Sequence, residues 1–401
     1  TYAFYIKVGS DEKTAAQDNK DSDQAGYLQY TDGANKVYVK IASANVCSIG
    51  TREYATLAEA LEEAVTGDTI TLLQSITHTS PVEIAGKSIT FALGSFDLTI
   101  DTSTEDGSTA LLVTDGGKVN YTGAGKFSAI GNSTAVRADG ASSALTVGYA
   151  ETTGDVAYTV QATSGGTATV NGNVVAKQAG TSALWTASGG SITITGSVTC
   201  VGENSTGARS AGTGSNITVH SGITATAAGD GSTGVNANNG GTATITGDIS
   251  ASERGVTTFG SGSAVTVTGN VSITGTATGS ADREGISAGG GTTVTVNGNV
   301  SAAGENCTGI YANGSTVTVT GDVTSENTGV VATGLNGTVT IDGELTADTT
   351  YIKVGTIPKT AADDNKDSDL AGYLQYTDGT HNVYIDIMGT VDVLEITRRY
   401  P

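Results

Sequence analysis

The sequence predicts an all-β protein, a single-stranded parallel β-helix (β-solenoid) with a capping helix and small β-hairpin modules at both ends. Three observations lead to this prediction. Strand-like blocks ending in glycine recur through the middle of the chain, one segment occurs twice, and large apolar residues are scarce. Of 401 residues, 57 are Gly, 5 are Phe, and Met and Trp occur once each. This composition cannot fill one thick core, but it can fill a thin core repeated along an axis.

The short repeat dominates residues 160–346, where blocks such as TVTVNGNV at 293–300 recur. The alternation places Val294 and Val296 on one face of a strand and threonines on the other. One coil cannot bury its valines alone, whereas coils stacked at ~4.8 Å bury them and pair their backbones. The marker glycines of these blocks are 22 to 29 residues apart, a drift that suits coils with insertions at their corners. They are Gly172, Gly196, Gly222, Gly247, Gly269, Gly298, Gly321 and Gly343.

Each coil carries a second apolar block, such as CTGIYAN at 307–313, followed by glycine-rich corners. Glycine supplies the positive φ angles that a tight corner needs. Before the coils, Thr56 and Glu59 form a capping-box pattern, and apolar residues at helical spacing follow. We therefore expect a helix over 56–65, with Gly67 after it. The open end of a solenoid exposes apolar residues and strand edges, so an amphipathic cap is expected there.

The segment YATLAEALEEAVTGDTITLL, followed by SITFALGSFDLTI, resembles the entry to right-handed parallel β-helices of the pectate-lyase-like superfold. It is most similar to those in the repeat regions of large surface proteins and adhesins of Gram-positive, often gut-dwelling, bacteria. The resemblance covers residues 54–346. It implies a right-handed coil and an extracellular, cell-surface location.

One long segment occurs twice, once near each end of the chain. Residues 5–41 and 351–387 match at 27 of 37 positions, at a constant offset of 346. Within each copy, the sequence AGYLQY, a Thr-Asp-Gly turn and a second alternating run predict a hairpin. A weaker match aligns TREY at 51–54 with TRRY at 397–400.

These repeats predict three parts. Residues 1–53 form a β-hairpin junction module, and 54–350 form the parallel β-helix with its capping helix. Residues 351–401 are the second copy of the module and the start of the next tandem unit. We expect the modules to join consecutive solenoids and shield their ends.

The charge of the chain argues against several partners. The net charge is −21 and the pI about 4.3, so no basic surface is available for nucleic acid or for anionic membranes. No apolar run predicts direct membrane insertion. Cys47, Cys200 and Cys307 are scattered, which excludes a disulfide framework or zinc knuckle. We interpret them as buried small hydrophobes, with a reactive or intermolecular thiol, mainly at Cys47, as the alternative.

Acidic residues at alternating spacing recur in both modules and resemble half of a calcium loop. The distal Glu of an EF-hand is missing, and Lys20 sits inside the first cluster. Two interpretations stay open, a solvated acidic turn and calcium at the junction modules; no other cofactor is predicted. The candidate ligands are Asp18, Asn19, Asp21 and Asp23, repeated as Asp364, Asn365, Asp367 and Asp369.

The residue after the buried Val or Ile of the second block varies between coils, as a binding surface on a constant frame would. Trp185, Arg209, Asn236 and Tyr311 are the candidates for this ligand face. Trp185 and Tyr311 lie five coils apart, roughly 24 Å, so they cannot stack on one sugar together. Ordinary surface variation is the alternative to surface-glycan binding.

Threonines also recur once per block and predict a ladder along another outer face. Such arrays resemble those of ice-binding proteins, although Thr is also what an exposed strand face tolerates. The ladder comprises Thr169, Thr193, Thr218, Thr244, Thr266, Thr295, Thr318 and Thr340.

Catalysis is not predicted. Lyases of this superfold need calcium-binding acids and a basic residue together on one face, whereas Arg209, Arg254 and Arg283 fall in different coils without clear carboxylate partners on their strands. The three histidines, His78, His220 and His381, are isolated, so no nucleophilic triad is arguable.

The sequence thus predicts a non-catalytic structural repeat unit of an extracellular bacterial surface stalk, fibre or adhesin. Its expected partners are neighbouring copies of itself. The alternatives are a filament subunit that assembles head to tail through its end modules, and a carbohydrate-binding surface module.

Overall fold

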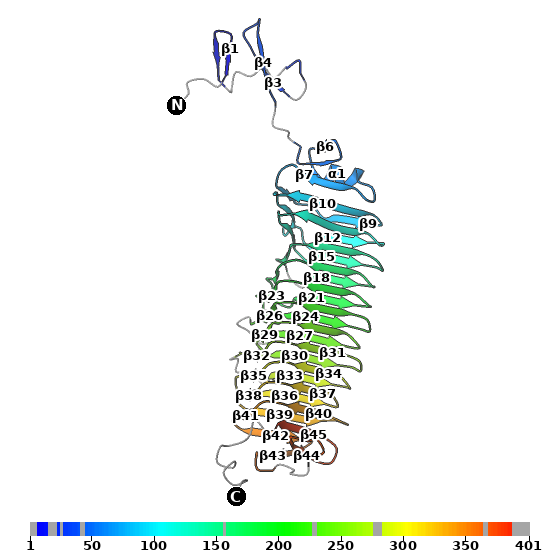
Figure 1. Cartoon of the computed structure of the whole chain (residues 1–401), viewed down its shortest axis with the longest axis vertical. Helices are drawn as coiled ribbons and strands as arrows, with labels where there is room; N and C mark the ends of the chain where they lie inside the picture. Colours follow the sequence, from blue (N-terminus) through cyan, green and yellow to red (C-terminus); the bar gives the residue numbers. More distant parts are fainter. Residues whose placement is uncertain are drawn as a thin grey trace.

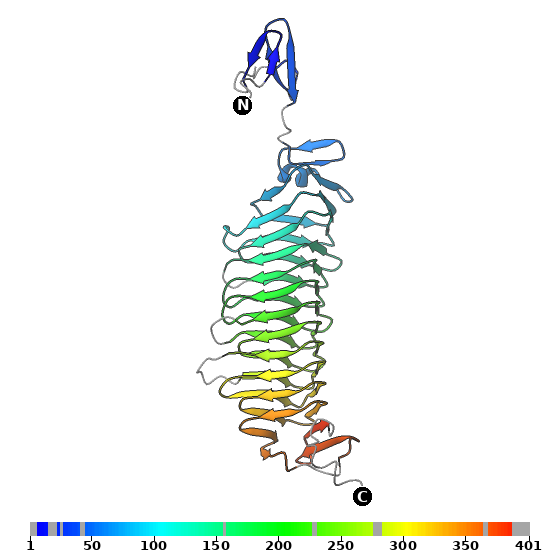
Figure 2. The ribbon, with the colours of Figure 1, turned by 60° about the vertical axis from the view of Figure 1, so that its left-hand side comes forward.

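A computed structural model describes residues 6–14, 22–24, 27–40, 45–154, 158–226, 231–275, 283–363 and 368–386. The central part is a parallel β-solenoid of about 11 turns, as predicted, in which each turn adds one strand to each of three sheets (Figures 1 and 2). Only one helix, α1 (Leu57–Glu63), occurs among the described residues. The protein is therefore an all-β solenoid with small antiparallel hairpins at its ends.

The first sheet has 16 strands and carries the TVTV blocks. Its strands are β5 (Cys47–Ile49), β6 (Arg52–Tyr54), β7 (Thr69–Leu72), β10 (Ser88–Gly94), β13 (Lys118–Gly123), β16 (Ala144–Val147), β19 (Thr167–Val170), β22 (Ser191–Ile194), β25 (Asn216–Val219), β28 (Thr242–Ile245), β31 (Ala264–Val267), β34 (Thr293–Val296), β37 (Thr316–Val319), β40 (Thr338–Ile341), β44 (Tyr373–Thr377) and β45 (Asn382–Asp386).

The second sheet has 12 strands and follows the marker glycines. Its strands are β8 (Ile76–His78), β11 (Leu98–Thr102), β14 (Phe127–Gly131), β17 (Tyr149–Thr152), β20 (Val174–Ala176), β23 (Ser197–Cys200), β26 (Gly222–Ala225), β29 (Asp248–Ala251), β32 (Val271–Ile273), β35 (Val300–Ala302), β38 (Val323–Ser325) and β41 (Leu345–Ala347).

The third sheet has 13 strands and carries the second block of each coil. Its strands are β9 (Val82–Ala85), β12 (Thr109–Thr114), β15 (Thr134–Asp139), β18 (Tyr158–Thr163), β21 (Ser182–Ala187), β24 (Thr206–Ala211), β27 (Thr233–Asn238), β30 (Arg254–Phe259), β33 (Arg283–Gly289), β36 (Cys307–Asn313), β39 (Thr328–Thr333), β42 (Thr350–Val354) and β43 (Ile357–Lys359). Outside the three sheets, β1 (Ile6–Val8) pairs with β2 (Asp11–Lys13), and β3 (Tyr27–Thr31) pairs with β4 (Lys36–Lys40).

The core is a narrow column of small apolar side chains. Val294 and Val296 of β34 are both 0% exposed, while Thr293 on the opposite face is exposed. In register with Val296, Val267 lies in the coil before it and Val319 in the coil after it, and both are buried. Each inward position therefore packs against the same position of its neighbours, which confirms the predicted alternation.

The marker glycines are needed for close approach between coils. A Cβ atom on Gly269 would meet the backbone of Gly247 at 2.5 Å, and one on Gly298 would meet Gly269 at 2.4 Å. The glycines after the second block have the other role, since Gly240 and Gly262 adopt φ angles of +87° and +83°. The two glycine positions of a coil are thus required for different physical reasons.

After several marker glycines, an Asn or Asp residue binds the next coil. The Oδ1 atom of Asp248 accepts a hydrogen bond from the backbone N–H of Asn270 at 2.7 Å, and Oδ1 of Asn270 accepts one from the N–H of Asn299 at 2.9 Å. Asn299 and Asp322 continue the ladder, each accepting from the following coil at 2.8 Å. This corner between the first and second sheets therefore satisfies backbone donors that the strands do not pair.

The N-terminal end of the solenoid is covered by α1 and by the hairpin of β5 and β6. Thr56 is the N-cap and its hydroxyl accepts from the N–H of Glu59 at 3.2 Å, as the capping-box pattern predicted. The helix ends at Glu63, earlier than the predicted 65, and Lys87 Nζ donates to two carbonyls of its last turn. Strand β5 pairs antiparallel with β7, so Cys47 lies inside this cap.

The three cysteines are free and buried. Desolvation raises the pKa of Cys47 to about 11 and that of Cys200 to about 12. A raised pKa disfavours the thiolate, which is the reactive form. These observations agree with the interpretation of small buried hydrophobes and oppose a reactive thiol at Cys47.

Candidate binding face

The outer surface of the third sheet contains the predicted ligand face. Trp185 of β21 lies in register with Arg209 of β24, which lies in register with Asn236 of β27. Three strands further on, Tyr311 of β36 occupies the same row, after Thr257 and Ser287. The predicted row therefore exists, and Trp185 and Tyr311 are five strands apart in the sheet order, as expected.

Trp185 stacks on an aromatic residue that the sequence did not predict as its neighbour. Its indole stacks on the ring of Tyr158 from β18, with centroids 4.4 Å apart and an interplanar angle of 21°. Both side chains are partly exposed. Their spacing of 27 residues has no helical or strand periodicity, so only the register of the coils brings them together. The pair forms an aromatic platform beside the exposed Arg209.

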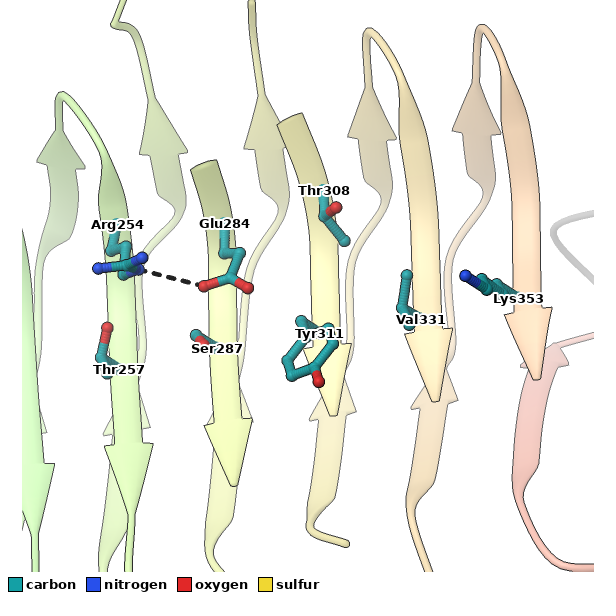
Figure 3. Close-up of a pocket in the computed structure, with 8 residues that line it drawn as sticks. All are labelled: Arg254, Thr257, Glu284, Ser287, Thr308, Tyr311, Val331 and Lys353. Atoms are coloured by element: carbon teal, nitrogen blue, oxygen red, sulfur yellow. Dashed lines mark hydrogen bonds and ion pairs between the residues drawn. The ribbon is translucent and has the colours of Figure 1, made fainter. Parts of the chain in front are cut away.

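A second part of the same face forms a shallow groove of about 490 Å³ around Tyr311. Figure 3 shows its lining side chains on successive strands of the third sheet. Tyr311 is partly exposed near the middle, and the exposed Lys353 marks the end towards β42. The lining residues are Arg254, Thr257, Glu284, Ser287, Thr308, Tyr311, Val331 and Lys353.

One expectation about this face was wrong. Arg254 has carboxylate partners, because its Nη1 lies 3.1 Å from Glu253 Oε1 and its Nε lies 3.2 Å from Glu284 Oε2. Glu284 follows Arg254 by 30 residues, yet the two are directly in register on β30 and β33. Because the coils differ in length, the sequence alone did not show that these two residues are neighbours. Arg283 instead donates to the carbonyl of Gly275 at 2.6 Å.

The groove therefore combines an aromatic ring, an ion pair, a cation from Lys353 and hydroxyl groups. These groups can stack against an apolar face and exchange hydrogen bonds with a polar ligand. No group of three or more His, Cys, Asp or Glu residues suited to a metal ion occurs in the described part of the chain.

The acidic candidates can be assessed at two positions. Asp23 accepts from the Tyr38 hydroxyl at 2.6 Å and pairs with Lys36. Asp369 accepts from the Tyr384 hydroxyl at 2.7 Å. Each aspartate thus binds the tyrosine of its own hairpin, and hydrogen bonding to Lys36 and Tyr38 lowers the pKa of Asp23. The other candidates, Asp18, Asn19, Asp21, Asp364, Asn365 and Asp367, lie outside the described residues.

The threonine ladder is also present, on the outer face of the first sheet. Thr295 of β34 lies in register with Thr266 before it and Thr318 after it, and the register continues from Thr169 to Thr340. At the C-terminal end Tyr384 of β45 replaces threonine in the row.

With this geometry established, the chain was compared with models of protein families, with curated proteins and with solved structures, and no match was found. No helix in the described ranges is both long and apolar enough to cross a membrane. The assignment to a parallel β-helix therefore rests on the strand pairings themselves.

Proposed function

We propose that this chain is a non-catalytic structural repeat unit of an extracellular bacterial surface stalk, fibre or adhesin. The right-handed coil and the assignment to a surface protein are part of this proposal. Both rest on the resemblance of residues 54–346 to β-helices of bacterial surface proteins. The mechanical part rests on the stacking of coils. About 11 turns at ~4.8 Å make a rod of roughly 50–60 Å, in which neighbouring coils pair their backbones throughout.

The observation that carries the proposal is the second module, because it binds the end of the solenoid as an added layer. β45 pairs with β40 and β42 pairs with β39. A module that closes one rod and recurs before the helical cap of the same rod suits a chain of rods in series. A stalk built in this way projects whatever it carries away from its point of attachment.

The test is the intact mass of the native polypeptide under denaturing and reducing conditions. We expect a mass several times the 39.8 kDa of this chain, because a stalk requires a covalent tandem array. A native mass near 39.8 kDa would exclude the covalent array. The alternative would then be a filament of separate subunits that contact one another head to tail.

The groove around Tyr311 favours a second candidate, binding of a carbohydrate. A partly exposed aromatic ring beside hydroxyl groups and a cation offers both stacking and hydrogen bonds to a sugar ring. A glycan array probed with the wild-type chain and with Tyr311→Ala tests it. Glycans bound by the wild type and lost with the variant would support this function, and an array without hits would contradict it.

A further inference from the structure

The two copies of the junction module have the same internal fold. Every residue pair of β1–β2 and β3–β4 recurs at the offset of 346 in β42–β43 and β44–β45. In each copy a glutamine side chain accepts from an aspartate N–H at 3.1 Å, from Asp23 to Gln29 and from Asp369 to Gln375. The module therefore adopts this fold whether or not a solenoid lies against it.

The surroundings of the two copies differ. In the second module, β42 pairs with β43 on one side and with β39 of the last coils on the other. In the same way β45 pairs with β44 and with β40. The hydroxyl of Tyr373 also donates to Asp342 Oδ1 at 2.6 Å. The second module thus extends the first and third sheets and closes the C-terminal end of the solenoid (Figure 2).

In the first module the corresponding edges have no strand partner among the described residues, since β1 pairs with β2 and β4 with β3 alone. The apolar side chains on these strands are accordingly more exposed. Tyr38 is 36% exposed, whereas its counterpart Tyr384 is 8% exposed. Ile6, Val37 and Val39 are partly exposed, whereas their counterparts Ile352, Val383 and Ile385 are 0% exposed. An unpaired strand edge with apolar side chains is a surface suited to strand addition.

We infer that the first module is a docking module for the C-terminal end of a second copy of this solenoid. It binds through β1 and β4, in the register by which β42 and β45 bind β39 and β40. Val37 and Val39 then lie opposite the positions of Val339 and Ile341, and Ile6 lies opposite that of Val330. The source of the second copy, a preceding unit of a tandem array, rests on the proposed function.

The residues at this contact are retained between the copies. Ile6, Lys7 and Val8 are identical to Ile352, Lys353 and Val354 of β42, and Tyr27 corresponds to Tyr373. On the other strand, the one change among the apolar positions is Val39 for Ile385. The charge changes lie at the ends of β4, where Lys36 and Lys40 replace Asn382 and Asp386. Apart from the smaller side chain of Val39, the first module therefore carries the apolar groups that β42 and β45 bury in the docked module.

The inference also assigns each module to the solenoid before it. The first module would close a preceding rod, while α1 and the β5–β6 hairpin close the N-terminal end of the rod that follows. Contacts of this kind are heterologous, so they can repeat head to tail from one copy to the next.

The first experiment gives the second module the sequence of the first module within the full chain. The ten positions at which 351–387 differs from 5–41 are changed to the residues of the first module, and hydrogen exchange is measured in β39 and β40. We expect these amides to exchange as slowly as in the wild type, because the first module closes the end equally well. Faster hydrogen exchange in β39 and β40 of this variant than in the wild type would overturn the inference.

The second experiment opens the solenoid end in the full chain. Val383→Asp with Ile385→Asp displaces β45, and sedimentation at increasing concentration should reveal head-to-tail oligomers that the wild type does not form. Adding Val37→Asp and Val39→Asp should restore the monomer. A monomeric opened variant with an intact circular dichroism spectrum, or association that survives the added substitutions, would contradict the inference.

These results are independent of the native mass. If the native mass is near 39.8 kDa and the first module still docks, the docking surface is supported and the covalent tandem array is rejected. A large native mass without docking would leave a tandem array whose rods do not contact one another through β1 and β4.

Discussion

The column of inward valines is the feature on which the stability of the rod depends, and Val296→Asp tests it. Val296 is 0% exposed and packs in register between Val267 and Val319 of the adjacent coils. Thr293→Asp provides a matched control, because Thr293 is exposed on the opposite face of the same strand. Both variants add one negative charge to β34, one on its buried face and the other on its exposed face.

The magnitude follows from two contributions. Removing a fully buried valine from the core costs roughly 1.5–3 kcal/mol of the free energy of unfolding. A carboxylate without a partner in an apolar interior adds several kcal/mol, even when it is relieved by protonation. The expected loss for Val296→Asp is therefore at least about 4 kcal/mol, against about 0.5 kcal/mol for the exposed control.

Hydrogen exchange and chemical denaturation measure these effects. Because solenoid stability is a sum over coils and their nearest neighbours, faster exchange should be centred on β31, β34 and β37 and decline with distance along the axis. The control should leave exchange unchanged. Equal denaturation midpoints for the two variants would refute the inward orientation of Val296 and with it the packing of the core.

Three further predictions concern other parts of the chain. Asn299→Ala should lower the free energy of unfolding by about 1 kcal/mol in chemical denaturation, because the N–H of the next coil loses its acceptor, whereas Asn297→Ala should be nearly neutral. Cys47 should react with a thiol reagent at pH 8 about 100-fold more slowly than an ordinary thiol until the protein is denatured, because its pKa of about 11 reduces the thiolate fraction; equal rates before and after denaturation would contradict this. Backbone and side-chain donors lower the pKa of Asp32 and of Asp378 to about 2. The stabilisation by these turns should therefore be complete above the ordinary pKa of 3.8 and be lost as the pH falls towards 2. NMR titration of the two carboxyl groups would measure these pKa values.

The sequence predicted much of the candidate binding face, because its rows follow the coil pattern. Aligning the second blocks is sufficient to place Trp185, Arg209, Asn236 and Tyr311 in one row. It was not sufficient to pair Trp185 with Tyr158, or Arg254 with Glu284. These partners lie three residues before the row position, and coil lengths that vary by several residues conceal which side chains become neighbours.

The sequence by itself determined the solenoid, the inward valines, the threonine ladder, the helical cap and the duplication. These features depend on local periodicity, which the backbone geometry of a strand or helix converts directly into a face. The tertiary structure alone decided how the corner asparagines join successive coils and how the two modules differ in their surroundings. Two nearly identical segments carry the same local information, so their difference arises only from what lies against them. The second module follows a solenoid end that its strands complete, whereas the described strands of the first module retain open edges.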